Sequence, residues 1–464
     1  MTLLPPVPFY TAPGSTTEPA RRRLLLISYH YPPGQASGVL RWQRLTRYAA
    51  ERGWALDAVT LAPADLPDQD PARLADLASG TRVYGVSRSR LLVPRLEALA
   101  SRSYRVLRPG RPHERANRTS RPLRRALHAC LEYARDLEWA RVAAALTCRL
   151  FAADGHHAVI SCGPPHMAHE AGRIVAARTG RPWLMDLRDP WSLLERSGTD
   201  DVASPVWYRL ARRYERPAVD AAALVVMNSD PARQAMQRAY PAAAKKIIAV
   251  MNGFDEYDPP QVTRGPFTVT FAGSIYLDRD PNLLLRPAAR AIRSLGATPD
   301  QFRIEFIGHA DAAALHAMAR AQGIVPYVST RYFVPHGQLG TLLAQAAVLV
   351  SLNQDSDLAI PAKVFEYLQY DAWVLALAER GSATELVLRD TGADVVSPKN
   401  EEAIEATLRE RYVQFAAGTR PTRLAPALPH LSRRAQADRL FDAIELLVSP
   451  TAVCEPTEAH PTKA

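Results

Sequence analysis

The stretch IPAKVFEYL at residues 360–368 can bring a cation and a carboxylate to one face of a helix. The chain has 57 basic residues, of which only five are lysines, so Lys363 is an exception among arginines. Pro361 suits the first turn of a helix, because the N–H that proline lacks would be unpaired there, and residues three apart share a helical face. Lys363 can bind phosphate and Glu366 can accept hydrogen bonds from hydroxyls. The alternative is an exposed salt bridge worth about 0.3–0.5 kcal/mol.

Two further polar segments follow runs that read as buried strands. His166 comes directly after HAVISCG at the start of a helix, where it can contact a ligand or act as a capping or surface histidine. His169 is a weaker alternative for the same role. The segment DLRDPWS places Asp186, Arg188 and Asp189 at a strand end. This acid-base-acid set can hydrogen-bond the hydroxyls of a ligand, or it can hold the following loop through pairing with Arg188.

Two glycine-containing turns offer backbone groups to a ligand. The loop after LLLIS carries Gly34 and Gly38 ahead of a helix. Glycine lets the backbone approach a ligand closely, and a helix amino end offers N–H groups to phosphate. A plain strand-to-helix turn is the alternative, since the GxGxxG dinucleotide fingerprint is missing. In FAGSIYLDRDP, Gly273 and Ser274 follow a strand, and Arg279 supplies a cation close behind them.

All of these residues stand near the ends of short apolar runs that alternate with amphipathic helical segments. Continuous apolar runs are typical of strands buried on both faces, and their alternation with helices predicts an α/β fold. The proline-rich, charged stretch 255–266 separates two such series. We therefore expect two Rossmann-like, doubly wound domains facing a cleft, with ligands at the carboxyl ends of the strands. The expected strands are 24–28, 55–61, 157–163, 182–187, 223–228 and 246–252, then 267–273, 303–309, 348–354, 373–379 and 393–398.

Five segments occur in the order seen in family-four glycosyltransferases of the GT-B fold. They are LLLISYHYPPGQASGVLRWQRLTRYAAERGW, PWLMDLRDPWS, VMNGFD, FAGSIYLDRDP and IPAKVFEYL. From about residue 22 to residue 448 the chain resembles this family, and it is most similar to the polysaccharide-biosynthesis members that carry D-x-R-D-P-W. The resemblance implies transfer of a sugar from a nucleotide sugar to a hydroxyl acceptor. It also implies retention of anomeric configuration, with no metal and no cofactor beyond the nucleotide sugar as co-substrate.

The resemblance further implies roles for individual residues. Glu366 would bind ribose hydroxyls and Lys363 would lie nearer the phosphates. The full set expected to bind the donor is Gly34, Gly38, Gly273, Ser274, Arg279, Lys363 and Glu366. The residues expected to be catalytic are His166, Arg279 and Lys363. The residues expected to bind the acceptor are Asp186, Arg188 and Asp189.

The chain departs from the family pattern at two positions. Ser274 stands where many members carry a basic residue that binds the donor diphosphate. Leu358 replaces the first acid of the E-x7-E pattern, of which Glu366 is the second. Two other functions therefore stay open: a nucleotide-sugar epimerase of the same fold, and a non-catalytic scaffold with the GT-B fold.

Composition and the linker set the expected domain boundaries. We expect a disordered leader at 1–20, an N-terminal acceptor domain at 21–256 with a basic insertion at 86–125, a nucleotide-sugar-binding domain at 262–430, a terminal helix at 431–448 and a disordered tail at 449–464. From Arg88 to Arg125, twelve arginines accompany only Glu97 and Glu114, a net +10 that equals the excess of the whole chain. Such a cluster can face nucleic acid or anionic lipid, or it can be a solvated insertion.

Further features restrict the partners and the compartment. The basic cluster lacks the interleaved aromatics of a single-strand binder, so we expect an anionic membrane surface and no nucleic acid. No apolar run approaches the ~20 residues of a membrane-spanning helix, and the first residues lack the basic region of a signal peptide. The four cysteines show no metal-ligand spacing. We expect a cytoplasmic protein that binds peripherally to the inner face of the membrane.

Overall fold

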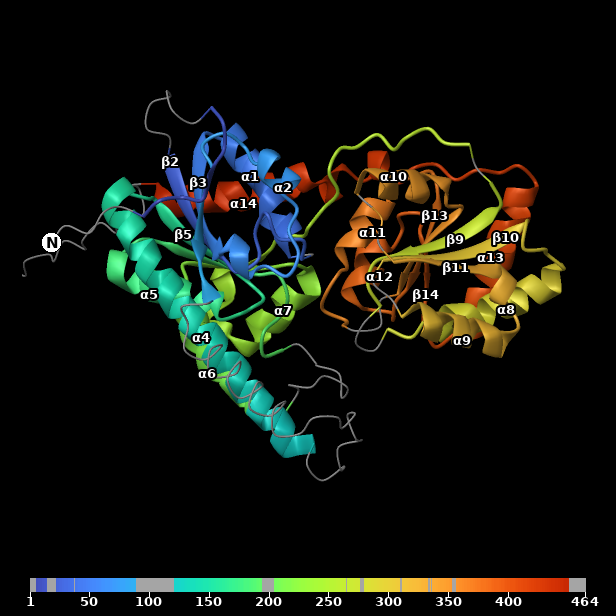
Figure 1. Cartoon of the computed structure of the whole chain (residues 1–464), viewed down its shortest axis with the longest axis horizontal. Coiled ribbons are helices and arrows are strands. Elements are labelled where there is room, and N and C mark those ends of the chain that lie inside the picture. The colour runs from blue at the N-terminus through green and yellow to red at the C-terminus, as the bar shows by residue number, and fades with distance from the viewer. Residues whose placement is uncertain are drawn as a thin grey trace, which may run out of the picture.

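The computed structural model describes residues 6–14, 22–36, 38–88, 121–193, 204–263, 265–275, 279–308, 311–332, 334, 336–352 and 356–449. Most of the basic insertion, at 89–120, and the tail beyond residue 449 lie outside the described residues. Figure 1 shows two α/β bodies side by side, one built from the first half of the chain and one from the second. Along the chain, the strands of one sheet precede the stretch 255–266 and the strands of the other sheet follow it.

The N-terminal sheet has eight strands in the order β1-β4-β3-β2-β5-β6-β7-β8. All neighbouring pairs are parallel except β1 with β4. If β1 and β8 are set aside and the other six strands are numbered from 1 to 6 in chain order, the sheet has the doubly wound order 3-2-1-4-5-6. This order confirms the expected fold class. The strands are β1 Tyr10–Thr11, β2 Arg22–Ser28, β3 Trp54–Leu61, β4 Arg82–Val86, β5 Ala158–Gly163, β6 Trp183–Leu187, β7 Leu224–Met227 and β8 Ile247–Ala249.

Part of the expected leader is ordered, so that expectation is corrected for residues 9–12. Backbone N–H groups of Phe9 and Ala12 donate to Val83 and Thr81 of the β4 region, both at 2.9 Å. Ala12 is buried and Tyr10 packs against the core. The flanking prolines obscured a short edge strand, because proline cannot donate in a sheet and is therefore confined to its margins.

Helices cover both faces of the N-terminal sheet, because successive strand residues point to opposite sides. On β2, Leu25 and Ile27 join the core under α4, α5, α6 and α7, whereas Leu24 and Leu26 join the core under α1 and α14, the helix Arg433–Val448. In Figure 1 one end of α4 extends past the sheet. The helices are α1 Val39–Glu51, α2 Ala72–Ala75, α4 Arg121–Asp154, α5 Ala168–Thr179, α6 Pro205–Ala221 and α7 Asp230–Ala239.

The C-terminal sheet is entirely parallel and has the order β11-β10-β9-β12-β13-β14, again 3-2-1-4-5-6. Serine and asparagine side chains cap several helices of the two domains, as at Ser229, Asn400 and Ser432. The strands are β9 Phe267–Ala272, β10 Phe302–Ile307, β11 Val328–Arg331, β12 Val348–Leu352, β13 Trp373–Leu377 and β14 Asp394–Val396. The helices are α8 Asn282–Leu295, α9 Ala312–Gln322, α10 His336–Gln345, α11 Ala362–Tyr367, α12 Ala383–Leu388, α13 Glu401–Ala416 and α14 Arg433–Val448.

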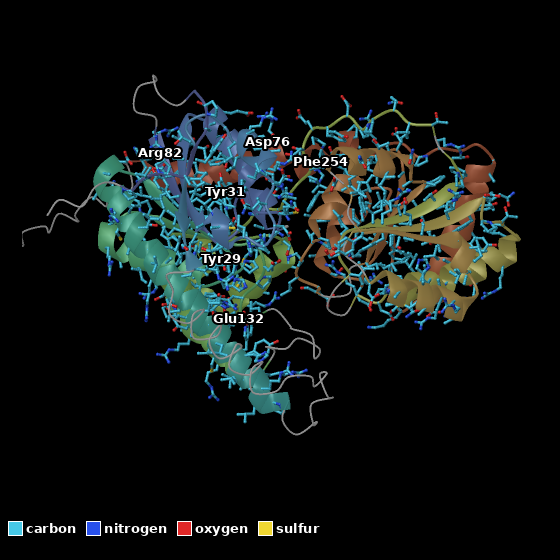
Figure 2. All side chains as sticks on the ribbon, viewed as in Figure 1. Tyr29, Tyr31, Asp76, Arg82, Glu132 and Phe254 are labelled. Carbon is cyan, nitrogen blue, oxygen red and sulfur yellow. The ribbon has the colours of Figure 1, made fainter. Side chains whose placement is uncertain are left out.

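Helix α14 follows the C-terminal sheet in the chain but packs on the N-terminal domain. Phe441 lies in the core shared with α1, and Arg52 donates to Asp438 at 2.9 Å and to Asp442 at 2.7 Å. The chain passes between the domains at Phe254, which Figure 2 labels at their junction. There the Phe254 N–H donates to the carbonyl of Leu431 at 3.1 Å. Two crossings of the chain therefore tie the domains together.

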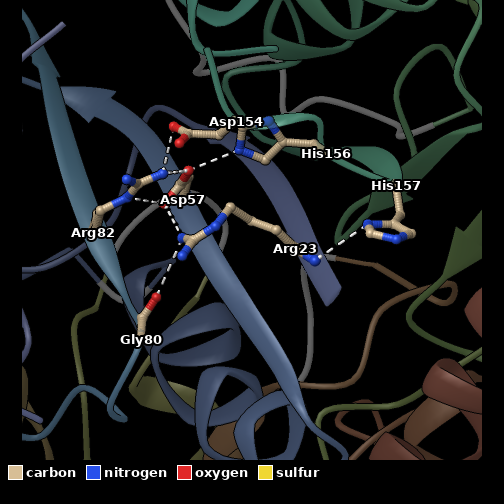
Figure 3. Close-up of polar contacts among 7 residues, drawn as sticks. All are labelled: Arg23, Asp57, Gly80, Arg82, Asp154, His156 and His157. Carbon is tan, nitrogen blue, oxygen red and sulfur yellow. Dashed lines mark hydrogen bonds and ion pairs between the residues drawn. The ribbon is translucent and has the colours of Figure 1, made fainter. Parts of the chain in front are cut away.

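A buried ionic cluster holds the amino edge of the N-terminal sheet (Figure 3). The Asp57 carboxylate is fully buried on β3 and binds Arg23 at 2.7 Å, Arg82 at 2.8 Å and His156 at 2.7 Å. Burial alone would raise the pKa of Asp57, but hydrogen bonds from Arg82 and His156 and the charge of Arg23 hold this pKa below its usual value. These residues join β2, β3, β4 and the start of β5 at the edge opposite the carboxyl ends.

Candidate functional site

The strand orders place a switch point in each sheet, between β2 and β5 and between β9 and β12. At such a point the neighbouring connections leave in opposite directions, and the crevice at the carboxyl ends binds ligands in doubly wound folds. The segments that leave these four strands contain most of the residues that the sequence singled out. The residues found there are Gly34, Gly38, His166, Gly273, Ser274, Arg279, Lys363 and Glu366.

Lys363 of α11 reaches the carboxyl end of β9. A Cβ added to Gly273 would lie 2.5 Å from Lys363 Nζ, so only glycine leaves room for the ammonium beside this backbone. Gly273 also has φ +134°, a conformation that side chains other than glycine rarely adopt. The ammonium lies 3.8 Å from the centre of the Phe271 ring, and such cation–π contacts hold a cation in place. The lysine and the glycine thus belong to one arrangement.

Arg279 brings a second cation to the same strand end. Its Nη1 donates to the carbonyl of Ser274 at 3.2 Å, so Ser274 contributes its backbone here. Gly308, at the end of β10, has φ +121°, and a Cβ there would lie 2.7 Å from the carbonyl oxygen of Gly273. The sequence reasoning missed Gly308, although it stands directly after a strand in RIEFIGH, where a glycine permits close approach of two turns.

Tyr367 fixes the helix that carries Lys363 and Glu366. Its hydroxyl accepts a hydrogen bond from the Ala272 N–H at 3.0 Å and donates to the Ala272 carbonyl at 3.2 Å. Burial, with a smaller contribution from the charge of Glu366, raises the pKa of Tyr367, so the hydroxyl stays protonated. Glu366 itself is half-buried. Sequence reasoning missed Tyr367, which anchors α11 to the end of β9.

Leu358 explains one departure from the family pattern. Its side chain packs against the core of the N-terminal domain, and its carbonyl accepts a hydrogen bond from the hydroxyl of Ser229, which caps α7. The position where the resemblance calls for an acid is therefore an apolar contact between the two domains. A charged side chain there would have to lose its hydration on packing.

In the N-terminal domain, Arg188 lies against Gly38. A Cβ at Gly38 would stand 1.8 Å from Arg188 Nη1, so this glycine is required for the guanidinium to occupy its place. Asp189 lies 3.9 Å from Arg188 Nε, and its side chain is partly exposed. Arg188 and Gly38, far apart in the sequence, thus meet at the carboxyl edge.

Asp186 has a different position from its two neighbours in DLRDPWS. It is fully buried, and its carboxylate binds Arg41 Nε at 2.8 Å, Arg41 Nη2 at 2.9 Å and Trp42 Nε1 at 2.8 Å. Arg41 also donates to Asn252 at 3.2 Å and to the carbonyl of Val250 at 3.1 Å. This geometry gives Asp186 a structural role other than the expected pairing with Arg188, because both of its oxygens hold α1 against the sheet.

His166 and His169 also differ in their surroundings. The half-buried His166 ring stacks on Trp191, with ring centres 5.1 Å apart and planes at 20°. His169 is fully buried and shares a hydrogen bond of 2.9 Å with Ser161. Burial lowers the pKa of His169 to about 3, so it is neutral. His166 is therefore the more accessible histidine of this pair.

Gly34 is held by neighbouring loops. Its N–H donates to the carbonyl of Tyr31 at 3.1 Å, and its carbonyl accepts from Arg73 at 3.2 Å. Its backbone is therefore engaged within the domain. Figure 2 labels Tyr29 and Tyr31 on the segment that leaves β2.

Solved structures share this architecture over nearly the whole chain. Sucrose-phosphate synthase from Thermosynechococcus elongatus is 14% identical, with a TM-score of 0.61 over 92% of this chain and 99% of the other. TarM from S. aureus, in a complex that includes UDP, is 9% identical, with a TM-score of 0.61 over 92% and 99%. The lipopolysaccharide outer core galactosyltransferase WaaB is 10% identical, with a TM-score of 0.54 over 91% and 99%.

These likenesses define the class of fold. The chain has the GT-B fold, two doubly wound domains whose carboxyl edges carry the candidate site, as the sequence predicted. No protein-family model and no curated protein sequence matches the chain.

Among the described residues, no group of three or more histidine, cysteine, aspartate or glutamate side chains is placed to hold a metal ion. None of the helices described is both long and apolar enough to span a bilayer.

Proposed function

We propose that the protein transfers a sugar from a nucleotide sugar to a hydroxyl acceptor. The observation that carries this proposal is the pair of cations at the end of β9, where Lys363 lies against Gly273 and Arg279 binds the turn at Ser274. Two cations beside a turn at a strand end suit a diphosphate, because both charges can pair with its oxygens. The neighbours with the same fold include proteins described as transferases or bound to UDP, which supports the choice.

The proposed reaction makes one bond and breaks one. An acceptor oxygen bonds to the anomeric carbon while the bond from that carbon to the diphosphate oxygen breaks. The electron pair and the hydroxyl proton leave with the nucleoside diphosphate, and the anomeric configuration is retained. Lys363 and Arg279 would stabilise the charge that develops on the diphosphate, which requires no cofactor besides the nucleotide sugar. Glu366 would hold the ribose hydroxyls.

A panel of nucleotide sugars tests this proposal. We expect slow release of nucleoside diphosphate from one donor, and faster release when an acceptor hydroxyl is added. An epimerase would instead return the epimeric nucleotide sugar without transfer to an acceptor, and a scaffold protein would leave every donor unchanged. Separation of the nucleotides by chromatography distinguishes the three outcomes.

The family resemblance implies that His166 contacts the donor sugar, so this residue tests the sugar end of the donor site. We expect His166→Ala to lower turnover by about 10- to 100-fold, because a sugar that loses one positioning contact reacts less often. Affinity for the nucleoside diphosphate should stay nearly unchanged, since the contact is with the sugar alone. His430→Ala, at an exposed histidine of the C-terminal domain, is the control. Unchanged turnover in His166→Ala would return this residue to its packing role on Trp191.

We also propose that the protein acts at an anionic membrane surface on the cytoplasmic side, where its acceptor is a glycolipid or a lipid-linked sugar used in polysaccharide synthesis. The basic insertion at 86–125 lies mostly outside the described residues, but α6 adds an independent observation. Four of its arginines are exposed, and their spacing places them on one face of the helix. None forms an ion pair in the described part of the chain. They are Arg209, Arg212, Arg213 and Arg216.

Vesicle sedimentation checks this surface. We expect the protein to sediment with anionic vesicles at low salt and to be released as salt rises, because each basic residue near the surface contributes about 1 kcal/mol before screening. Replacing the four α6 arginines by glutamine should weaken binding clearly. The control removes four exposed arginines from the C-terminal domain, which changes the net charge equally: Arg293, Arg303, Arg320 and Arg409. Equal sedimentation with neutral and anionic vesicles would refute the proposal.

A further inference from the structure

Arg188 extends across the switch point of the N-terminal sheet. It follows β6, yet its guanidinium lies against Gly38 at the start of α1, the helix that follows β2. Strand β5 lies between β2 and β6 in the sheet, so the side chain passes over the carboxyl end of β5. Burial raises the pKa of Cys162 near that end, and the charge of Arg188 opposes this rise, which agrees with this path. In doubly wound folds this crevice is where ligands bind.

The guanidinium of Arg188 is largely enclosed and has few partners in the described part of the chain. Its side chain is 15% exposed, and its ion pair with Asp189 is long, at 3.9 Å. The other nearby acid, Asp186, is already bound by Arg41 and Trp42. A guanidinium has five N–H donors in a planar fork, and a carboxylate or a phosphate can bind two of them at once. The arginine is therefore arranged for an oxyanion that the described residues do not supply.

His30 lies two residues after β2, on the segment that leads to Gly38 and α1. Burial, and then the charge of Arg188, lower the pKa of His30 to about 4, so the ring is neutral near pH 7. Its ring has an edge contact with Tyr29 and no hydrogen bond to any described residue. A neutral imidazole donates one hydrogen bond and accepts another, so it can bind a hydroxyl or an oxyanion. His30 was not singled out from the sequence, although it follows a strand directly in LLLISYH.

We propose that Arg188 and His30 form an anion-binding subsite, and that the acceptor carries a phosphate or a carboxylate close to the hydroxyl that receives the sugar. This inference rests on the proposed sugar transfer and names the chemical class of its acceptor. The donor diphosphate is the other possible source of the anion. The donor's expected cations, Lys363 and Arg279, stand however on the other domain, at the end of β9. Gly38 beside Arg188 was also expected to bind the donor, but it offers no cation, so we assign the subsite on the N-terminal domain to the acceptor.

Inorganic phosphate tests the subsite without any transfer. We expect phosphate to shift the NMR signals of the His30 ring in the full-length protein. Arg188→Gln should weaken this response by about tenfold or more, and Arg188→Lys should keep part of it, because lysine retains the charge but not the fork. Arg181→Gln is the matched control, since Arg181 is exposed and precedes β6 at the opposite edge of the sheet. Equal responses in the wild type and Arg188→Gln would overturn the subsite.

Transfer assays separate the two sources of the anion. We compare a neutral acceptor with a matched one that bears a phosphate or a carboxylate. Arg188→Gln should raise the KM of the anionic acceptor by about tenfold and leave the KM of the donor unchanged. A raised donor KM with an unchanged acceptor KM would assign the subsite to the diphosphate and overturn the anionic acceptor.

Failure of this inference can be distinguished from failure of the proposed function. If transfer continues and Arg188→Gln leaves the KM of the anionic acceptor unchanged, the inference is overturned and sugar transfer stays intact. If no donor releases nucleoside diphosphate, sugar transfer itself fails, and the inferred acceptor fails with it. The phosphate titration then still decides whether Arg188 and His30 bind an anion. Arg188→Lys is the control for misfolding of Arg188→Gln, because lysine keeps a cation against Gly38.

Discussion

Asp186→Asn is expected to lower the free energy of unfolding of the N-terminal domain by about 3–5 kcal/mol, because it leaves a buried arginine without its counter-charge. Arg41 has a side chain only 2% exposed, and both oxygens of Asp186 bind it. Asparagine keeps the size of the side chain but supplies one acceptor and no charge. Urea denaturation followed by tryptophan fluorescence measures this loss, since six of the seven tryptophans precede residue 255.

Asp57→Asn is the matched control, because Asp57 is also a buried acid of this sheet. Its arginines, Arg23 and Arg82, have side chains 22% and 24% exposed, so water can solvate them once the carboxylate is removed. We expect a smaller loss of about 1–3 kcal/mol near pH 7. Equal losses in the two variants would contradict the idea that the burial of Arg41 sets the larger cost.

The pH dependence of the Asp57 control has a definite sign. Because the pKa of Asp57 is lowered in the folded protein, its carboxylate stabilises the fold above the unfolded value of about 3.9. That stabilisation is lost as pH falls through the folded pKa. The gap between the wild type and Asp57→Asn should therefore be full near pH 7 and shrink below about pH 4. A gap that grows towards acid would show that Asp57 stabilises the fold in another way.

The strands could be predicted because burial on both faces marks them in the sequence. The expected strand at 157–163 matches Ala158–Gly163, and the one at 182–187 matches Trp183–Leu187. By contrast, RVYGV at β4 and VSTR at β11 were missed. Strand β4 contains an arginine and a glycine, and β11 lies at the edge of its sheet with three polar residues. Edge strands bury less side chain and therefore carry a weaker apolar signal.

Contacts between distant segments could not be predicted from the sequence. The amphipathic pattern of α14 predicts a helix but does not say which domain it covers, and the structure places it on the first. The same limit applies to Leu358. The sequence shows only that an acid is missing there, whereas the structure supplies the reason, a contact with the N-terminal core. The apolar pattern of a helix predicts which of its faces is buried. It does not predict which other element that face packs against.

The residues of the candidate site were easier to find than their roles. The rule that ligands bind at the carboxyl ends of strands led to Gly273, Lys363 and Arg188. Asp186 and Arg188 are only two positions apart in the sequence, yet one side chain lies in the core and the other at the edge. Both lie at the end of β6. The sequence does not show that Arg41 of α1 binds the carboxylate of Asp186.

Lys363→Met and Glu366→Ala are expected to weaken the binding of different parts of one ligand, the diphosphate and the ribose. Lys363 lies beside the Gly273 backbone, where a diphosphate would approach, so its loss should weaken a nucleoside diphosphate much more than the bare nucleoside. That difference should shrink at high salt, because the lost interaction is between charges. Glu366→Ala should weaken both ligands equally, by about 1.5–3 kcal/mol, since it removes hydrogen bonds from the ribose. Calorimetric titration of each variant with both ligands measures these affinities.

Two controls fix the meaning of that result. A 2',3'-dideoxy nucleoside diphosphate should bind the wild type and Glu366→Ala almost equally, because it lacks the hydroxyls that Glu366 would bind. Lys245→Met and Glu410→Ala change exposed residues of the same types outside the site, and they should alter no affinity. If Lys363→Met weakens the nucleoside as much as the diphosphate, the lysine does not face phosphate. If neither site variant changes any affinity, the donor binds elsewhere, and the two residues only hold α11 in place.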